Sequence, residues 1–322
     1  MSKNSLSFYN SNINIVMYHY VRKKEKKYPN LRILEYNKFK SQIDYLTKNF
    51  NILSKNQFLE IVDSNKIPYK PSVLLTFDDG YKDHYNYVFP YLLKKKITGS
   101  FYAPINPITK KTVLDANKIQ YILSIGRDPK KIIIDINNFL VKKSLKKLDI
   151  EKIQKKIKKD GTISPYDDRN TNLIKRVLQY ILPKKIRIEI INYLLEKNVK
   201  VTEKELSEKL YLNKQEIREM HTNGMDFGSH SVSHPYLNLC NEKKQIKEIL
   251  NSKLFYKKLG LNTKNFSIAY PYGSYNANTL KIVRRLKLSY AFIDSPGIID
   301  SRNIKNKYTF PRLDGGNIIA HD

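Results

Sequence analysis

Residues 72–80, with the sequence SVLLTFDDG, decide how this chain folds. The first six form a nearly continuous apolar run of strand length, which is typical of a parallel strand buried on both faces. The strand then runs straight into Asp78 and Asp79. An isolated Asp-Asp-Gly favours a simple turn. Two adjacent carboxylates at a strand end also allow a division of labour, in which one binds a metal ion and the other takes a proton from the metal's water.

Outward from this strand, short β-type runs alternate with helical patterns. Strands are predicted at 13–18, 72–77, 98–103, 225–228, 266–270 and 289–293. Helices are predicted at 39–50, 55–64, 82–95, 214–222, 242–259 and 277–287. This alternation indicates an α/β fold with a parallel sheet closed into a barrel, in which the chemistry lies at the C-terminal ends of the strands.

Residues 104–212 depart from this alternation. The segment is rich in Lys and Ile, mostly helical in spacing, and poor in strand signals, with a predicted helix at 181–196 and a loop at 161–172. The α/β pattern resumes after it. We therefore predict a single domain over 1–322 with a long helical insertion at 104–212.

Three more predicted strand ends carry residues suited to chemistry. The strand at 225–228 leads into His230 and His234, which can share one metal because four residues separate them on one compact turn. The strand at 266–270 leads into Pro271-Tyr272-Gly273, a rigid turn that presents an aromatic wall or a backbone N–H. The strand at 13–18 leads into His19, a side chain suited to donating a proton near neutral pH.

Composition narrows the kinds of site and partner. The 59 Lys and Arg residues against 30 Asp and Glu give a net charge of +29, which favours nucleic acid, an anionic glycan, a nucleotide- or lipid-linked sugar, or an anionic membrane. Because Lys greatly outnumbers Arg and the charge is spread along the chain, a lysine-rich solvated surface is the preferred interpretation. The single cysteine, Cys240, excludes a disulfide framework and any multi-cysteine metal site, so His and carboxylates must hold a metal.

The start of the sequence, MSKNSLSFYNSN, is polar, and no stretch approaches the ~20 apolar residues of a membrane span. We therefore expect a cytoplasmic protein without a transmembrane segment, which can associate peripherally with an anionic membrane.

Together, these motifs resemble the polysaccharide deacetylase family, carbohydrate esterase family 4, whose NodB-like domain is a distorted (β/α)7-type barrel that removes N- or O-acetyl groups from glycans. Residues 76–80 match the family's TFDDG motif, and residues 230–234 (HSVSH) match its H-S/T-x-x-H motif. The strand and helix pattern fits the resemblance across 10–103 and 213–313. The resemblance implies that Asp78 is the catalytic base. It also implies one divalent metal ion, expected to be Zn²⁺, with the ligands Asp79, His230 and His234.

The third and last motifs depart from the family pattern. The usual R-x-P-Y/F is replaced by AYPYG at 269–273, so the Arg that orients the base is missing, and Arg312 in FPRLDG is the candidate replacement. No D-x-x-D-W-R motif exists, because the chain has no Trp. The proton donor is His321 in the final NIIAHD or His19 in VMYHYV. We prefer His19, because VMYHYV resembles the N-terminal MYH motif of the subgroup that also carries AYPYG and deacetylates poly-N-acetylglucosamine.

We therefore expect a metal-dependent hydrolase that removes an N-acetyl or O-acetyl group from a carbohydrate in surface glycan biosynthesis. The backbone N–H of Tyr272, flanked by Pro271 and Gly273, is expected to bind the oxyanion. Two alternatives stay open. One is a deacetylase-like barrel that only binds a glycan, and the other is a basic nucleic-acid-binding protein, for which the chain shows no recognised motif.

Overall fold

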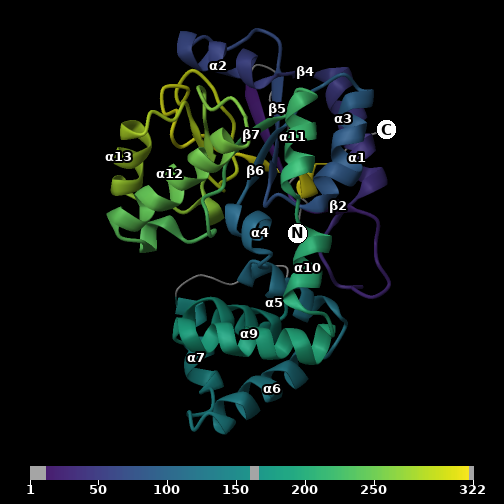
Figure 1. The fold of residues 1–322 in the computed structure, drawn as a ribbon, viewed down its shortest axis with the longest axis vertical. Coiled ribbons are helices and arrows are strands. Elements are labelled where there is room, and N and C mark those ends of the chain that lie inside the picture. The colour runs from purple at the N-terminus through teal and green to yellow at the C-terminus, as the bar shows by residue number, and fades with distance from the viewer. Residues whose placement is uncertain (1–11, 160–166, 319–322) are drawn as a thin grey trace. The chain divides into compact units, whose positions relative to one another are not determined.

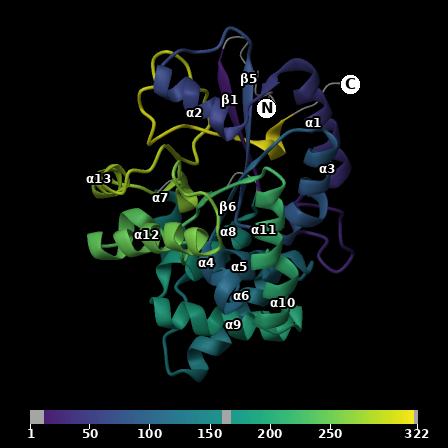
Figure 2. The same ribbon diagram turned by 45° about the horizontal axis from the view of Figure 1, so that its top comes forward.

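The computed structural model describes residues 12–159 and 167–318 of the chain. They form two compact units, whose elements can be followed by colour and label (Figure 1) and, from a second direction, in Figure 2. Unit 1 contains the described residues of 1–23, 33–112 and 207–322. Unit 2 contains 24–32 and the described residues of 113–206.

Unit 1 is built on an eight-stranded sheet in which every pairing is parallel. Seven strands follow one another in the order β10 (Leu313–Asp314), β1 (Ile13–Tyr18), β5 (Ser72–Asp78), β6 (Ser100–Ala103), β7 (Asp226–Ser229), β8 (Ile268–Ala269) and β9 (Ala291–Phe292). The eighth, β4 (Asn51–Ile52), also pairs with β5. A separate two-stranded sheet joins β2 (Val21–Arg22) to β3 (Leu34–Glu35).

The segment that leads into β10 links the two edges of this sheet. Phe310 bridges in parallel to Phe292 of β9, and three residues later Leu313 pairs with Val16 of β1. The same short stretch of backbone therefore contacts both β9 and β1. The sheet curls into a distorted barrel, which confirms the predicted α/β fold class.

Alternation along β5 explains how this strand is buried on both faces. Val73, Leu75 and Phe77 pack in the cluster that contains α1 (Tyr36–Asn49), whereas Leu74 packs with Tyr102 and Phe292 of other strands. Because side chains alternate along a strand, Asp78 lies on the same side as Leu74. The sequence pattern of this one strand thus places a carboxylate at the end of the barrel interior.

Seven helices of unit 1 surround the sheet. Besides α1 they are α2 (Lys55–Ser64), α3 (Phe89–Lys94), α4 (Ile105–Lys110), α11 (Lys214–Thr222), α12 (Glu242–Lys258) and α13 (Ala277–Arg285). Ser54, Asn213 and Asn276 begin α2, α11 and α13 with reciprocal capping boxes, so the sequence itself fixes where these helices start. The helix predicted at 82–95 is present as one helical run over 82–94, in which a wide π-type turn at His84–Val88 leads directly into α3.

Unit 2 is mostly helical, whereas its segment 24–32 forms turns. It contains α5 (Asp115–Ser124), α6 (Pro129–Lys142), α7 (Ile150–Lys159), α8 (Arg169–Arg176) and α9 (Lys184–Val199), and it shares α10 (Glu203–Leu210) with unit 1. Buried aliphatic side chains of α6 and α9, such as Ile136 and Leu194, form its interior. Within the helical stretch predicted at 181–196, Pro183 is the N-terminal cap of α9 and fixes where this helix starts. Among the helices in the described part of the chain, none is long and apolar enough to cross a bilayer.

Candidate metal centre and active site

The parallel register brings the C-terminal ends of several strands to one end of the barrel. β1 and β5 pair from Ile13↔Ser72 to Tyr18↔Phe77, so His19 and Asp78 follow at the same level. β6 pairs with β5 and with β7, and Ser229, the last residue of β7, pairs with Ile268 of β8. All sequence-predicted site residues within the described ranges belong to unit 1. His321 lies outside the described residues.

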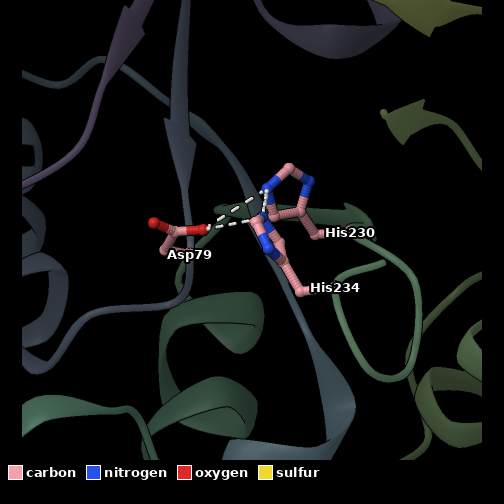
Figure 3. A group of neighbouring side chains, drawn as sticks. All are labelled: Asp79, His230 and His234. Carbon is pink, nitrogen blue, oxygen red and sulfur yellow. Dashed lines mark hydrogen bonds and ion pairs between the residues drawn. The ribbon is translucent and has the colours of Figure 1, made fainter. Parts of the chain in front are cut away.

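Asp79, His230 and His234 point toward one another and form a compact triangle of donor atoms (Figure 3). Asp79 Oδ1 lies 3.4 Å from His230 Nε2 and 3.3 Å from His234 Nε2. The two Nε2 atoms are 3.1 Å apart. Tetrahedral ligands with bonds of about 2.0–2.1 Å to one ion lie roughly 3.3 Å from each other, so the three donor atoms fit a Zn²⁺-like ion.

The hydrogen bonds around the triangle leave the lone pairs of its donor atoms free to face its centre. His230 Nδ1 is 2.7 Å from the Ala269 carbonyl oxygen, and because a carbonyl only accepts, Nδ1 carries the proton and Nε2 keeps its lone pair. This is the usual outer partner of a metal-binding His. The Tyr81 hydroxyl donates to Asp79 Oδ2 over 2.6 Å. Asp79 Oδ1 is buried and accepts no hydrogen bond from the described residues.

The electrostatics of the triangle also suit a cation. Burial raises the pKa of Asp79, but the imidazoles of His230 and His234 outweigh that effect and hold the pKa far below its usual range. Burial lowers the pKa of His234 to about 3, so this imidazole is neutral. Burial opposes protonation of His230 as well, yet Asp78 and Asp79 raise its pKa. Two ionised carboxylates in a buried pocket therefore attract positive charge, which a divalent ion would supply.

The loop that carries the two His ligands is tied to α12 by one carboxylate. Glu248 is 8% exposed. Its Oε2 accepts from the backbone N–H groups of Val232 and Ser233 over 2.9 and 2.8 Å, and its Oε1 accepts from the Ser233 hydroxyl over 2.6 Å. Within the loop, the Ser231 hydroxyl accepts from the His234 backbone N–H over 2.9 Å. These contacts fix the loop between the ligands, which orients both imidazoles.

Asp78 and Arg312 form a buried two-pronged ion pair beside the triangle. Arg312 Nη1 donates to Asp78 Oδ1 over 2.9 Å, and Nη2 donates to Oδ2 over 2.7 Å. The side chains are 2% and 1% exposed, respectively. Burial raises the pKa of Asp78, but the charge and hydrogen bonds of Arg312 hold it below its ordinary value. The structure thus brings together the predicted base and the Arg proposed to orient it, and the carboxylate is ionised.

His19 follows β1 and is half-buried. It is also among the groups that lower the pKa of Asp78 and of Asp79, after the larger effects of burial and of nearer groups. His84, which is fully buried, donates through Nε2 to the His19 backbone carbonyl over 2.9 Å. Burial is the main cause that lowers the pKa of His84 to about 4, so a neutral imidazole holds the backbone at His19.

Pro271, Tyr272 and Gly273 form a tight turn next to His234. The Tyr272 ring meets the His234 ring edge-on at 4.5 Å and stacks on Tyr236 at 4.0 Å. Tyr272 is 37% exposed, so this aromatic pair forms a wall beside the donor triangle. Gly273 has a φ of +60°, and a Cβ there would lie 2.6 Å from the backbone nitrogen of Asp294. Only glycine fits this position.

Four of these residues adopt a left-handed backbone that is uncommon outside glycine: Asp79 (φ 68°), Ser231 (φ 62°), His234 (φ 55°) and Tyr272 (φ 57°). Such conformations cost free energy and persist where surrounding contacts enforce them, often at functional sites. Two metal-ligand candidates and the expected oxyanion-binding residue share this property.

Sequence reasoning did not find Tyr81, His84 or Glu248. Each acts on a site residue through a contact that no motif encodes. His84 and Glu248 reach partners 65 and 15–16 residues away. Only Tyr81 could have been noticed in the sequence, because it directly follows the DDG motif, two residues after Asp79.

Comparison with known proteins agrees with the geometry. The family model described as polysaccharide deacetylase matches residues 150–291, less than half of the chain; this range includes both His ligands but not Asp78 and Asp79. The Bacillus subtilis (strain 168) protein YxkH, provisionally named a polysaccharide deacetylase, is 28% identical over 94 residues. That alignment covers 29% of this chain and 33% of YxkH.

Solved structures share the fold over nearly the whole chain. The Streptococcus pyogenes deacetylase PplD, in complex with acetate, superposes with a TM-score of 0.58 at 21% identity, covering 95% of this chain and 93% of that chain. IcaB from Ammonifex degensii gives 0.56 at 16% identity, covering 94% and 91%. A de-N-acetylase from Aggregatibacter actinomycetemcomitans gives 0.54 at 16% identity, covering 97% of both chains. At these identities the structures establish the fold, a deacetylase-type (β/α) barrel.

Proposed function

We propose that this protein is a metal-dependent deacetylase that removes N-acetyl groups from an amino-sugar glycan. The observation that carries the proposal is the pairing of two features at one end of the barrel. The donor triangle of Asp79, His230 and His234 lies beside an ionised carboxylate, Asp78, which Arg312 holds in place. One feature suits a cation with an open coordination position, and the other suits a general base.

Each residue has a distinct role in the proposed reaction. A divalent ion held by Asp79, His230 and His234 would acidify a coordinated water and polarise the acetyl carbonyl. Asp78 takes the proton of the attacking water. Arg312 keeps the Asp78 carboxylate ionised and fixes its orientation through two hydrogen bonds. The Tyr272 backbone N–H donates to the oxygen on which negative charge develops. His19 protonates the departing amine, which leaves acetate and a free amino sugar.

One feature of the site supports a carbohydrate as the substrate. The wall of Tyr272 and Tyr236 beside the donor triangle offers an aromatic face for the apolar side of a sugar ring. We further propose a role in surface-glycan biosynthesis, on a nucleotide- or lipid-linked precursor. The cytoplasmic location expected from the sequence stays a prediction, which cell fractionation would test.

The decisive test is acetate release from N-acetylglucosamine oligomers by the zinc-loaded protein. We expect activity in the wild type and at least a 100-fold loss in Asp78→Asn and in His230→Ala, since a missing general base alone costs about 10²–10⁴ in rate. A surface variant, Lys243→Gln on α12, is the matched control and should keep full activity. If Asp78→Asn and His230→Ala released acetate at the wild-type rate, the proposal would be wrong.

Three more measurements separate the parts of the proposal. An O-acetylated sugar assayed in parallel tests the choice of amide over ester, because faster release from the ester would reverse it. His19→Ala should lose activity most strongly on substrates with a poor leaving amine, and full activity in this variant would assign the proton donor elsewhere. Metal content of the purified protein separates an enzyme from a barrel that only binds glycan.

A further inference from the structure

The helix α6 of unit 2 has one buried apolar face and, on its opposite side, two exposed apolar side chains among polar ones. One face carries Ile132, Ile136 and Leu140, which are buried in the unit. The other carries Ile134 and Val141, two helical turns apart, with exposed fractions of 56% and 50%. Leu145 follows in the turn that ends the helix and is 39% exposed. A helix that packs on one side only needs a single apolar face, so this second row has no role in the interior of unit 2.

This row concentrates exposed apolar surface. Among the described residues, nine large apolar side chains are exposed, and three of them lie within the twelve residues 134–145. Scattered single exposed apolar residues are ordinary, but a cluster indicates an interaction surface.

The sequence on both sides of this apolar row is rich in lysine. Eleven of the thirty residues 130–159 are Lys and only three are acidic. The exposed lysines that flank the row in the sequence include Lys130, Lys131, Lys142, Lys146 and Lys147. Within the described ranges, none of these five has an acidic partner within salt-bridge distance. Lys143, by contrast, pairs with Glu189. The charge around the apolar row is therefore available to an external anion.

We propose that this face of unit 2, formed by Ile134, Val141, Leu145 and the five exposed lysines, binds the surface of an anionic lipid bilayer. Aliphatic side chains enter the acyl boundary while lysine ammonium groups stay at the level of the lipid phosphates. The composition favours a bilayer over nucleic acid. The face offers aliphatic rather than aromatic side chains and lysine rather than arginine, whereas base recognition uses stacking and arginine forks. The proposal does not depend on the enzymatic activity proposed above.

The test is co-sedimentation of the full-length protein with phosphatidylcholine vesicles that contain or lack phosphatidylglycerol, at physiological ionic strength. We expect binding only to the anionic vesicles. Each lysine near an anionic surface contributes about fivefold to partitioning, so Lys142→Gln/Lys146→Gln should weaken it about 25-fold. Ile134→Asn/Val141→Asn should weaken it by at least about tenfold, because two aliphatic groups no longer leave water.

The matched control removes the same charge from unit 1. Lys243 and Lys247 are exposed one turn apart on α12, and Lys243→Gln/Lys247→Gln should partition like the wild type. Circular dichroism verifies that all variants are folded. The proposal fails if wild-type protein does not bind the anionic vesicles, or if both lysine pairs weaken binding equally. It also fails if Ile134→Asn/Val141→Asn binds as tightly as the wild type, since the apolar row would then contribute nothing. Retention on duplex DNA that depends on Lys142 and Lys146, without vesicle binding, would assign the face to nucleic acid instead.

Discussion

Replacing Arg312 with Met should destabilise the protein more than any other single loss of charge at the site. Both partners of the Asp78–Arg312 pair are almost wholly buried, at 2% and 1% exposed. Removing one partner of such a pair leaves a buried charge without compensation, which costs about 3–5 kcal/mol. For a domain of this size, each kcal/mol lowers the melting temperature by about 2–4 °C, so we expect a fall of roughly 6 °C or more.

The assay is thermal unfolding of the purified protein, followed by circular dichroism at neutral pH. Arg302 provides a matched control, because it also forms an ion pair, with Asp300, but its side chain is 85% exposed. Arg302→Met should leave the melting temperature unchanged, since exposed pairs are screened by water and contribute little. Arg312→Lys keeps the charge without the two-pronged geometry and should fall between the wild type and Arg312→Met.

A double variant distinguishes two causes of destabilisation in Arg312→Met: loss of the attraction between Arg312 and Asp78, and burial of Asp78 as an unpaired charge. In Asp78→Asn/Arg312→Met the charge is gone, so this variant should be more stable than Arg312→Met by more than about 1 kcal/mol. If Arg312→Met unfolded at the same temperature as Arg302→Met, the pair would be hydrated in solution, and the reasoning from its burial would be refuted.

Three other predictions follow from the site. Glu248→Gln should weaken Zn²⁺ affinity by about 10–100-fold in titration calorimetry, because the loop between His230 and His234 loses its charged acceptor; unchanged affinity would show that the loop is held by its own contacts. Chelation should lower the melting temperature and added Zn²⁺ should restore it, since an ion that binds only the folded state stabilises it, whereas His234→Ala should make the melting temperature insensitive to both. His84 has a folded pKa of about 4 against 6.5 for the free group. Its contribution to stability is therefore complete above about pH 6.5 and is lost as the pH falls toward 4, by up to roughly 3 kcal/mol. Denaturant titrations should show that His84→Gln, which keeps a donor for the His19 carbonyl, loses less stability over that interval than the wild type does.

The sequence predicts the central strands well, because each is marked by a short apolar run that ends in polar residues. The prediction at 13–18 coincides with β1, and that at 72–77 differs from β5 by one residue. The strands at 266–270 and 289–293 shrink to two residues each, in β8 and β9. Apolar periodicity reports burial, whereas strand length in the folded barrel depends on how long two neighbours stay parallel.

The two-residue strands β4 and β10 carry too little pattern to be predicted. β10 matters most, because Arg312 precedes it. The sequence could name Arg312 only as a candidate replacement for a missing Arg, since its partner lies 234 residues earlier. Glu248 gave no signal at all: on a lysine-rich helix, one acidic residue reads as part of a solvated face. Such contacts follow from tertiary packing, which no local pattern contains.

The late position of Arg312 also has a consequence for synthesis on the ribosome. Asp78 is made 234 residues before the guanidinium that neutralises it, which at 5–20 residues per second is a delay of roughly 10–50 s. During that time the strands cannot enclose Asp78 without burying a lone charge, at a cost of several kcal/mol. The stretch from Phe310 to Leu313 both joins β9 to β1 and delivers this counter-charge. We expect a nascent chain that stops short of this stretch to keep Asp78 hydrated and this end of the barrel open.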